Sequence, residues 1–468
     1  MWSRRAFLAT ASGTALSGAV PPAKRTNVVM IMTDDHGAWS LGSYGNSDAH
    51  TPILDRLALD GARFTRVFAV AAVCSPSRAS YITGKIPSQH GVQDYILGEE
   101  TVGPDAKRFL AGHTTYSEIL ARHGYRLGYF GKWHIGDDAT AQAGFHEWFA
   151  TAGGTYRTTR VYRKDRPEEI QGYRTDVITG RVLDFLDANS SRPFFIQVGY
   201  NAPHTPYDYQ PEEYRGPYLE SKFPAFPDLP PHPNQIRSYR QYLGQRESRL
   251  SYMALVRGVD QNVGRIVDKL RELELRENTL VIFCADQGFN CGHHGVWGKG
   301  NGTLPFNMYD ETLRVPMIFN HPGTIRSGQV VDPMVSTLDF FPTLLDYLGL
   351  PPHGDESLAG RSFAGFLRGR PRRWENRVFA EYAYVRTMRS DRLKYVQRAD
   401  GHPDEMYDLE RDPGERKNVA LEPAYASQRA RLRDEMATWF AARGAPPIDQ
   451  WRSTVRVKLD PVHYEFNR

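Results

Sequence analysis

Three short apolar runs constrain the fold of this chain more than any other feature. Residues 27–33, 193–198 and 279–285 are dominated by β-branched, aliphatic and aromatic side chains. Runs of this length without polar alternation are typical of strands that are buried on both faces of a parallel sheet. Between the second and third runs, apolar residues recur at helical spacing from Val256 to Leu270. Strands alternating with helices predict an α/β fold, in which helices cover both faces of a mainly parallel sheet.

Polar side chains follow two of these runs at the point where each predicted strand ends. Asp34 and Asp35 come directly after the first run, and Asp286 and Gln287 directly after the third. The carboxyl ends of parallel strands form the ligand crevice of open α/β sheets, so we expect these groups to converge. Three converging carboxylates repel one another unless a cation lies between them. A ligand set of carboxylate and carboxamide oxygens fits a hard divalent cation and does not fit zinc.

A motif that begins at Cys74 supplies the candidate nucleophile. The run CSPSRASYITG occupies positions 74–84. It resembles the signature of the type I sulfatases, in which C-x-P-S-R is followed by a Thr-Gly pair. In that family a formylglycine-generating enzyme oxidises the cysteine to formylglycine, and the hydrated aldehyde is the nucleophile. A thiol would attack sulfur poorly and would compete as a soft metal ligand, whereas a geminal diol has one hydroxyl to attack with and a second to expel the product.

The resemblance covers most of the chain in the family's order. The matching segments lie at residues 27–37, 42–45, 51–58, 131–136, 202–206, 285–288 and 298–299. Each segment alone is weak evidence, whereas the ordered set is not a plausible chance match. The resemblance implies an alkaline-phosphatase-like α/β architecture and the activity of a sulfuric ester hydrolase.

The resemblance also implies roles for the side chains around the nucleophile. Arg78 and Lys132 would hold the formylglycine hydrate and its negative charge. His134 would take the proton of the second hydroxyl when the enzyme-bound sulfate ester collapses. His204 and Lys299 would bind the sulfate and help the leaving oxygen depart. Charge grows on the sulfuryl and leaving oxygens in this reaction, which calls for cations and proton donors in a dry site.

By the same resemblance the metal is calcium, with magnesium as the alternative. Its ligands would be Asp34, Asp35, Asp286, Gln287 and the converted Cys74. The family most commonly has asparagine where this chain has Gln287, and glutamine keeps the carbonyl ligand. Asp286 would also help to deprotonate the attacking hydroxyl.

Several further histidines and cysteines lie near these motifs. We interpret His36, next to the acidic pair, as structural, and the sequence leaves open whether His293 and His294 reach the substrate. Cys284 and Cys291 flank the second acidic motif and could pair. A short bridge there would constrain the metal loop, so we expect two free thiols.

The N-terminus indicates export. Residues 1–22 contain SRRAFL and then small apolar residues, and they resemble a twin-arginine signal peptide. The apolar stretch is too short for a membrane anchor, and no other window of the sequence approaches a membrane span. We therefore expect a periplasmic or secreted protein.

The rest of the chain divides into two predicted domains. Residues 23–371 form the catalytic domain, and residues 372–468 form a smaller C-terminal α+β domain. The expected C-terminal elements are strands at residues 377–384, 392–397 and 405–409 and a helix at residues 427–441. Residues 203–233 hold nine prolines and predict a surface excursion. Together with residues 102–107 and 151–164, this excursion is expected to shape the rim of the substrate site.

Charge gives little support to nucleic-acid binding, because 58 basic and 54 acidic residues are interspersed without a basic block.

The favoured function is removal of sulfate from a sulfated carbohydrate. A phosphate or phosphonate monoester hydrolase, which shares the scaffold, and an arylsulfatase are alternatives, and the single-metal ligand set favours the sulfatase over the former. A more remote alternative is a non-catalytic binder of sulfated glycans in which Cys74 stays unconverted.

Overall fold

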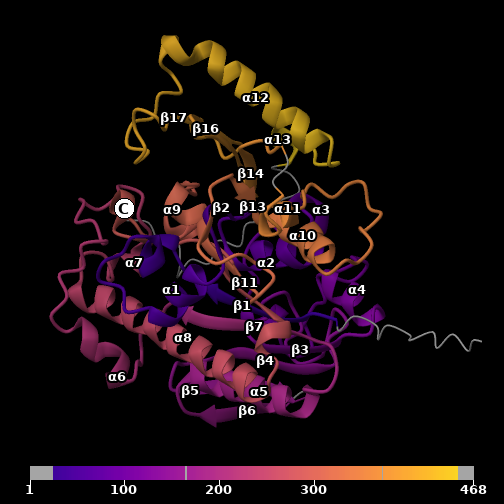
Figure 1. Ribbon diagram of the computed structural model, residues 1–468. Coiled ribbons are helices and arrows are strands. Elements are labelled where there is room, and N and C mark those ends of the chain that lie inside the picture. Colours follow the sequence, from indigo (N-terminus) through magenta and orange to yellow (C-terminus); the bar gives the residue numbers. More distant parts are fainter. Residues whose placement is uncertain (1–24, 164–165, 371–372, 452–468) are drawn as a thin grey trace, which may run out of the picture.

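The structure is a computed structural model that describes residues 25–163, 166–370 and 373–451 (Figure 1). The predicted signal peptide at residues 1–22 lies outside the described residues, as do residues 371 and 372 at the predicted domain boundary. Within the described ranges, no helix is both long enough and apolar enough to cross a membrane.

A large sheet forms the centre of the molecule. In the described residues it has eleven strands, in the order β12-β2-β11-β8-β1-β7-β3-β4-β5-β6, with β13 paired to β2. The strands are β1 Asn27–Asp34, β2 Ala62–Phe68, β3 Arg126–Gly131, β4 Glu147–Gly154, β5 Thr158–Arg163, β6 Arg166–Gln171, β7 Phe194–Pro203, β8 Thr279–Ala285, β11 Arg314–Asn320, β12 Gln329–Val331 and β13 Val335–Ser336. The central strands β8, β1, β7, β3 and β4 are parallel, whereas β11 runs antiparallel to β2 and β8. The predicted mainly parallel sheet is confirmed.

Strand β1 explains why the sequence pattern is continuously apolar. Its side chains alternate between the two faces of the sheet, and both faces are covered. Val29 and Ile31 belong to a buried cluster on one face, and Val28 and Met30 belong to a second cluster on the other. Every position of β1 is therefore buried, which favours apolar residues without alternation.

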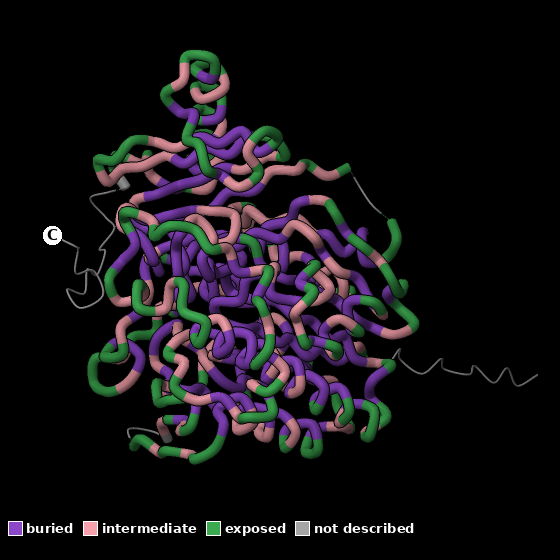
Figure 2. Tube along the Cα trace, turned by 90° about the vertical axis from the view of Figure 1, so that its left-hand side faces the viewer, coloured by how far each residue is buried: buried purple, intermediate pink, exposed green. Residues whose placement is uncertain are grey.

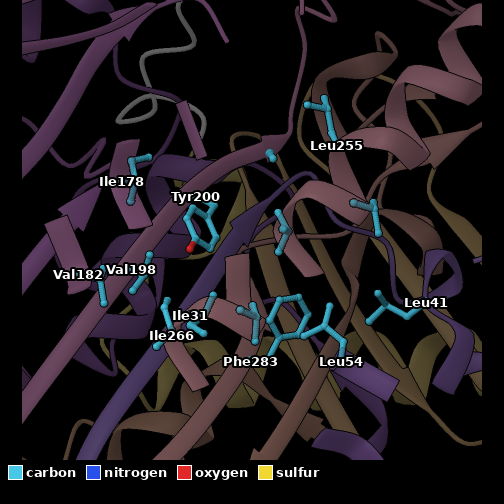
Figure 3. Close-up of a cluster of buried hydrophobic side chains, with 14 of the residues drawn as sticks. Ile31, Leu41, Leu54, Ile178, Val182, Val198, Tyr200, Leu255, Ile266 and Phe283 are labelled. Atoms are coloured by element: carbon cyan, nitrogen blue, oxygen red, sulfur yellow. The ribbon is translucent and has the colours of Figure 1, made fainter. Parts of the chain in front are cut away.

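Helices cover both faces. Those on the first face are α1 Pro52–Leu59, α5 Arg174–Asn189 and α8 Arg246–Glu272. Those on the second face are α2 Cys74–Thr83, α4 Tyr116–Arg122 and α10 Phe340–Tyr347. Figure 3 shows the first cluster, in which Ile266 of α8 packs with Ile31, Val198 and Phe283 from three neighbouring strands. The apolar spacing around Ile266 predicts this helix correctly.

A smaller antiparallel sheet follows near the C-terminus. Its strands are β14 Arg377–Tyr382, β15 Val385–Ser390, β16 Leu393–Arg398 and β17 Glu405–Asp408. Helix α12, Ala426–Ala441, lies against this sheet at the top of Figure 1. The strand predicted at residues 377–384 is present as β14 but ends at Tyr382, where the chain turns into β15, a strand that the sequence analysis did not predict. Ala383 takes a φ of +48° in that turn, and no glycine or proline marks it in the sequence.

The two sheets share a buried cluster. Phe68, Val73 and Cys74 from the larger part pack with Tyr382 and Val385 from the smaller sheet. Figure 2 shows buried residues through the interior of both parts. The division into domains at residues 23–371 and 372–468 stays a prediction.

The remaining α-helices and strands of the described residues are short. They are α3 Pro87–His90, α6 Glu212–Arg215, α7 Arg237–Arg240, α9 Asp310–Leu313, α11 Ala364–Leu367, α13 Ile448–Trp451, β9 Asn290–Cys291 and β10 Trp297–Gly298. The proline-rich stretch at 203–233 contains α6 and anchors itself through buried Tyr218, Phe223 and Phe226. It is therefore an anchored excursion rather than a loose loop.

Candidate active site

The carboxyl ends of β1 and β8 bring the predicted acidic residues together. The two strands pair in parallel register, so the residues that follow them emerge side by side. Asp34, Asp35, Asp286 and Gln287 are fully buried. The side-chain amide of Gln287 donates to Asp34 Oδ1 at 3.3 Å and to Asp35 Oδ1 at 2.6 Å. The expected convergence at this edge of the sheet is present.

Cys74 lies beside this group, as the first residue of α2. Its Sγ is 3.7 Å from Lys299 Nζ. Burial raises the pKa of the Cys74 thiol, although the ammonium groups of Lys132 and Lys299 oppose that shift. The N-terminal end of a helix favours negative charge, so the position suits a side chain that becomes anionic during a reaction.

Arg78 and Lys132 connect the nucleophile to the acidic groups. Arg78 is one helical turn after Cys74, and its Nε donates to Asp286 Oδ2 at 2.7 Å. Its Nη1 donates to the backbone oxygen of Lys132 at 2.6 Å. The Lys132 side chain, which follows β3, forms an ion pair with Asp34. Both predicted cations are therefore at the site.

Lys299 and His204 approach from the other side of the acidic group. Lys299 Nζ lies 2.7 Å from Asp35 Oδ1. His204 follows the end of β7, and its Nε2 lies 3.5 Å from Asp35 Oδ2. The side chain of His204 is 26% exposed, whereas that of Lys299 is 3% exposed. His204 therefore lies at the mouth of the site and Lys299 at its base.

His134 is poised as a proton acceptor. Its Nε2 lies 3.0 Å from the backbone oxygen of Ile96. A carbonyl oxygen only accepts, so Nε2 carries the proton and Nδ1 keeps a lone pair. That Nδ1 is buried without a hydrogen-bond partner in the part of the chain that the structure describes. Burial, with the nearby charge of Lys132, holds the pKa of His134 well below its usual value, so the ring is neutral near pH 7.

The acidic residues differ in their protonation. Burial alone would raise the pKa of Asp34, but the surrounding positive charges, Lys132 first, hold it well below its usual value. Burial and the negative charge of Asp34 raise the pKa of Asp286 to about 7. One carboxyl group thus stays ionised while a neighbour is able to exchange a proton near neutral pH.

The oxygen atoms in this group fit a cation. Asp34, Asp35 and His204 offer ligand atoms that lie within 4.8 Å of one another. Asp35 Oδ2 and Gln287 Oε1 are buried acceptors without a hydrogen-bond donor among the described residues. Buried oxygens of this kind need a partner, and a hard divalent cation supplies one. Asp286 belongs to the ligand set predicted from the sequence, but its carboxylate contacts the Arg78 guanidinium. Among the described residues, the group of close ligand atoms contains His204 in place of Asp286.

Three further histidines that the sequence analysis considered, His36, His293 and His294, have contacts of their own. His36 Nδ1 lies 3.1 Å from Thr33 Oγ1, and burial lowers the pKa of His36 to about 3, which agrees with a structural role. The ring of His293 packs on Trp39 at 4.9 Å. His294 Nε2 lies 2.8 Å from a Glu311 carboxylate oxygen. His293 and His294 are thus engaged outside the group around Cys74.

Two side chains near the site have no motif in the sequence. Asp138 is buried a few residues after His134, and burial raises its pKa to about 7. Tyr239 of α7 packs against the cluster that contains Cys74. Only their position in space identifies them.

The remaining cysteines, Cys284 and Cys291, are buried and free, as expected.

Comparison with known proteins assigns this arrangement to a family. The sulfatase family model matches residues 26–350. The chain belongs to the sulfatase family. A second model, the C-terminal part of N-sulphoglucosamine sulphohydrolase, matches residues 292–441 of this sulfatase.

Individual relatives agree with the family. The sulfatase is 25% identical over 495 residues to the N-acetylglucosamine-6-O-sulfatase of Bacteroides thetaiotaomicron, covering 87% of this chain and 85% of that protein. A solved structure in complex with its substrate D-glucosamine-2-N,6-O-disulfate aligns with a TM-score of 0.77 at 24% identity, over 91% of this chain and all 100% of that one. The phosphonate monoester hydrolase of Agrobacterium radiobacter aligns with a TM-score of 0.70 at 24% identity, over 90% and 96% of the two chains. These structural likenesses confirm the predicted fold.

The predicted class of enzyme is confirmed with the family. Sulfatases hydrolyse sulfate esters, so the sulfatase is a sulfuric ester hydrolase. The roles of its individual side chains stay predictions.

Proposed function

We propose that this sulfatase removes sulfate from a sulfated carbohydrate and that Cys74, converted to formylglycine, bears the nucleophile. The observation that carries the proposal is the position of Cys74 at the start of α2, beside three carboxylates and three cationic side chains. The thiol Sγ marks the place of the oxygens that the converted, hydrated side chain would carry. A formylglycine-generating enzyme is the partner required for that conversion.

Arg78 and Lys132 would orient the attacking oxygen. Arg78 Nη2 has no hydrogen-bond acceptor among the described residues, so it is available to an oxygen at position 74. Asp286, held by the same guanidinium at 2.7 Å, would accept the proton of the attacking hydroxyl. The positive charge of Arg78 opposes the rise that burial causes in the pKa of Asp286.

His134 would complete the turnover. Its Nδ1, which has no hydrogen-bond partner among the described residues, would accept the proton of the second hydroxyl. The electron pair of that O–H bond then forms the aldehyde C=O as the bond between carbon and the sulfate oxygen breaks and sulfate leaves. Because Nε2 is fixed on Ile96, the tautomer needed for this step is already present.

A calcium ion is the proposed metal, with magnesium as the alternative. Asp34, Asp35, Asp286 and Gln287 would hold it, and His204 lies close enough to Asp35 to join them. The ion would stabilise negative charge on the sulfuryl oxygens when bound. Gln287 Oε1, which is buried without a hydrogen-bond donor in the described parts of the chain, supports this assignment.

The leaving group is proposed to be a sugar oxygen. A sugar alkoxide leaves poorly and needs a proton as the ester bond breaks. His204 and Lys299 are placed to bind the sulfate and to assist that departure. The relatives support a carbohydrate substrate, since one acts on a 6-O-sulfated N-acetylglucosamine and a structural neighbour binds a glucosamine disulfate.

A phosphate or phosphonate monoester hydrolase is the second candidate, because a phosphonate monoester hydrolase shares the fold. An arylsulfatase is the third candidate.

Export through the twin-arginine signal at residues 1–22, to the periplasm or the exterior, would bring the enzyme to polysaccharide fragments.

The Cys74 peptide provides the direct test. Protein made beside a formylglycine-generating enzyme should show an aldehyde mass at Cys74 in place of a thiol. Cys74→Ala should abolish turnover and leave the melting temperature unchanged. Activity that survives in this variant would end the nucleophile assignment. A screen of sugar sulfates, aryl sulfates, phosphate esters and phosphonate esters then decides among the three candidates.

A further inference from the structure

The segment that carries His204 lacks two of its backbone hydrogen-bond donors. Pro203 and Pro206 flank the pair His204-Thr205, and proline has no backbone N–H. His204 N donates to Asn201 O at 2.9 Å, which ties the segment to the end of β7. The imidazole is tied to the same segment, because His204 Nδ1 donates to the backbone oxygen of Thr205. The direction of the ring therefore follows the peptide that joins these two residues.

Tyr156 holds that peptide from another part of the chain. Its hydroxyl donates to His204 O at 2.8 Å, although the two residues are 48 positions apart in the sequence. Tyr156 lies in the turn between β4 and β5, within the segment 151–164 that the sequence predicts at the rim of the substrate site. The residue is only 2% exposed, so water does not compete for this bond. The predicted rim thus contacts the site at the backbone of His204.

The turn is fixed well enough to act as a support. Tyr156 O accepts from Arg174 N, the first residue of α5, at 2.8 Å. The ring of Tyr156 stacks on that of Tyr173, with centroids 6.1 Å apart. Tyr156 N donates to Asp208 Oδ1 at 3.2 Å. Asp208 lies four residues after His204, so the turn is joined twice to the same segment.

The position of His204 in the pocket makes such a support useful. Its Nε2 lies 3.5 Å from Asp35 Oδ2, and its side chain is 26% exposed at the mouth of the site. Lys299 at the base is enclosed by its surroundings, which fix it. A ring that borders open space is enclosed on fewer sides, so its place depends more on the backbone that carries it.

We propose that Tyr156 is a positioning residue for His204, and that its hydroxyl keeps the imidazole where the leaving oxygen of the substrate departs. Without this hydroxyl, His204 O loses its buried donor, and the peptide and the ring are able to shift together. The inference rests on the role proposed for His204 and adds a residue that lies outside the sequence motifs.

The test compares Tyr156→Phe with the wild type in the metal-loaded, full-length protein. On a sugar sulfate, kcat/KM should fall about tenfold to a hundredfold, the scale of loss from a misplacement of about 1 Å. The loss on an aryl sulfate should be smaller, because an activated aryl oxide leaves without a proton. The variant keeps the ring and its stacking on Tyr173, so it should fold as the wild type does.

A double-mutant cycle separates positioning from a general structural effect. Tyr156→Phe is measured in the wild type and in His204→Ala on both substrates. Because Tyr156 acts through His204, the substitution should cause no further loss of kcat/KM once the imidazole is absent. The same loss in both backgrounds, or no loss in Tyr156→Phe on either substrate, would overturn the inference. If His204→Ala slows both substrates equally, the acid role of His204 fails, whereas a cycle without further loss still assigns Tyr156 to its positioning.

Tyr173→Phe is the matched control. It removes a hydroxyl from the ring that stacks on Tyr156. A Cβ placed at Gly258 would lie 2.6 Å from this hydroxyl, so it points toward α8 rather than toward His204. The control should leave kcat/KM on both substrates unchanged. A loss equal to that of Tyr156→Phe would show that the aromatic pair supports the fold in general, and it would contradict the specific role of the Tyr156 hydroxyl.

Discussion

Replacement of His204 by alanine tests which side of the pocket the leaving group occupies. The His204 side chain is 26% exposed, compared with 11% for Lys132 and 3% for Lys299. Cys74 is only 2% exposed. An in-line displacement places the attacking and leaving oxygens on opposite sides of sulfur, so the organic part of the substrate must depart through the open side, where His204 lies.

The size of the effect follows from the leaving group. General acid catalysis contributes about 10²–10⁴-fold, which corresponds to roughly 3–5 kcal/mol of transition-state stabilisation. An activated aryl oxide leaves without a proton and gains little from an acid. His204 also lies 3.5 Å from Asp35 Oδ2, so the variant will lose some sulfate or metal binding on every substrate. The informative quantity is therefore the ratio of the two losses.

The assay measures kcat/KM for a sugar sulfate and for a nitrophenyl sulfate with wild type and His204→Ala, together with the metal content of each protein. The loss on the sugar sulfate should exceed that on the aryl sulfate by at least about tenfold. His293→Ala is the matched control, because the His293 ring packs on Trp39 outside the site. It should reduce neither activity by more than a small factor.

Equal losses on both substrates would refute the acid role and leave His204 as a binding group. A loss that disappears when the metal content is restored would instead make His204 a metal ligand, in agreement with its place beside Asp34 and Asp35.

Two further predictions concern the metal and the stability of the fold. Asp34→Asn and Asp286→Asn should each lower metal affinity and rate, and chelated wild type should recover with calcium or magnesium but not with zinc; full activity in chelated enzyme would contradict the site. Burial raises the pKa of Asp260 on α8 to about 7, above its usual 3.8. The folded state then holds this proton more tightly than the unfolded state, so stability falls as pH rises from about 4 to about 7. Asp260→Asn keeps the acceptor for Leu54 N. Between pH 5 and pH 8 the free energy of unfolding of this variant should fall by roughly 2–3 kcal/mol less than that of the wild type. An equal fall in both proteins, measured by denaturant unfolding at the two pH values, would contradict this.

The sequence predicts the acidic edge of the sheet well because that edge depends on local rules. A carboxylate follows the end of each apolar run, and the parallel pairing of β1 and β8 brings the two strand ends side by side. Asp34, Asp35, Asp286 and Gln287 could therefore be brought together without knowledge of long-range packing.

The sequence could not place groups that depend on contacts between distant segments. The Tyr239 ring lies beside Gly298, the residue before Lys299, in a segment where Gln235 binds Trp297, some sixty residues later in the chain. The turn at Ala383 likewise forms by a positive φ that its residue type does not announce. The contact of Asp286 with Arg78 depends on how α2 packs on the sheet, which no spacing encodes.

The burial of α2 has a consequence for how the enzyme is made. All ten of its residues, Cys74 included, are enclosed by the fold, so a modifying enzyme has no access to the thiol once the chain is native. If Cys74 is converted as proposed, conversion and folding compete during synthesis, and the faster process decides the fate of each molecule. Native states of small domains can persist for days before they unfold, so under this proposal a molecule that folds with its thiol intact would become a long-lived inactive product. The specific activity of a preparation would thus depend on the fraction of molecules that were converted before they folded.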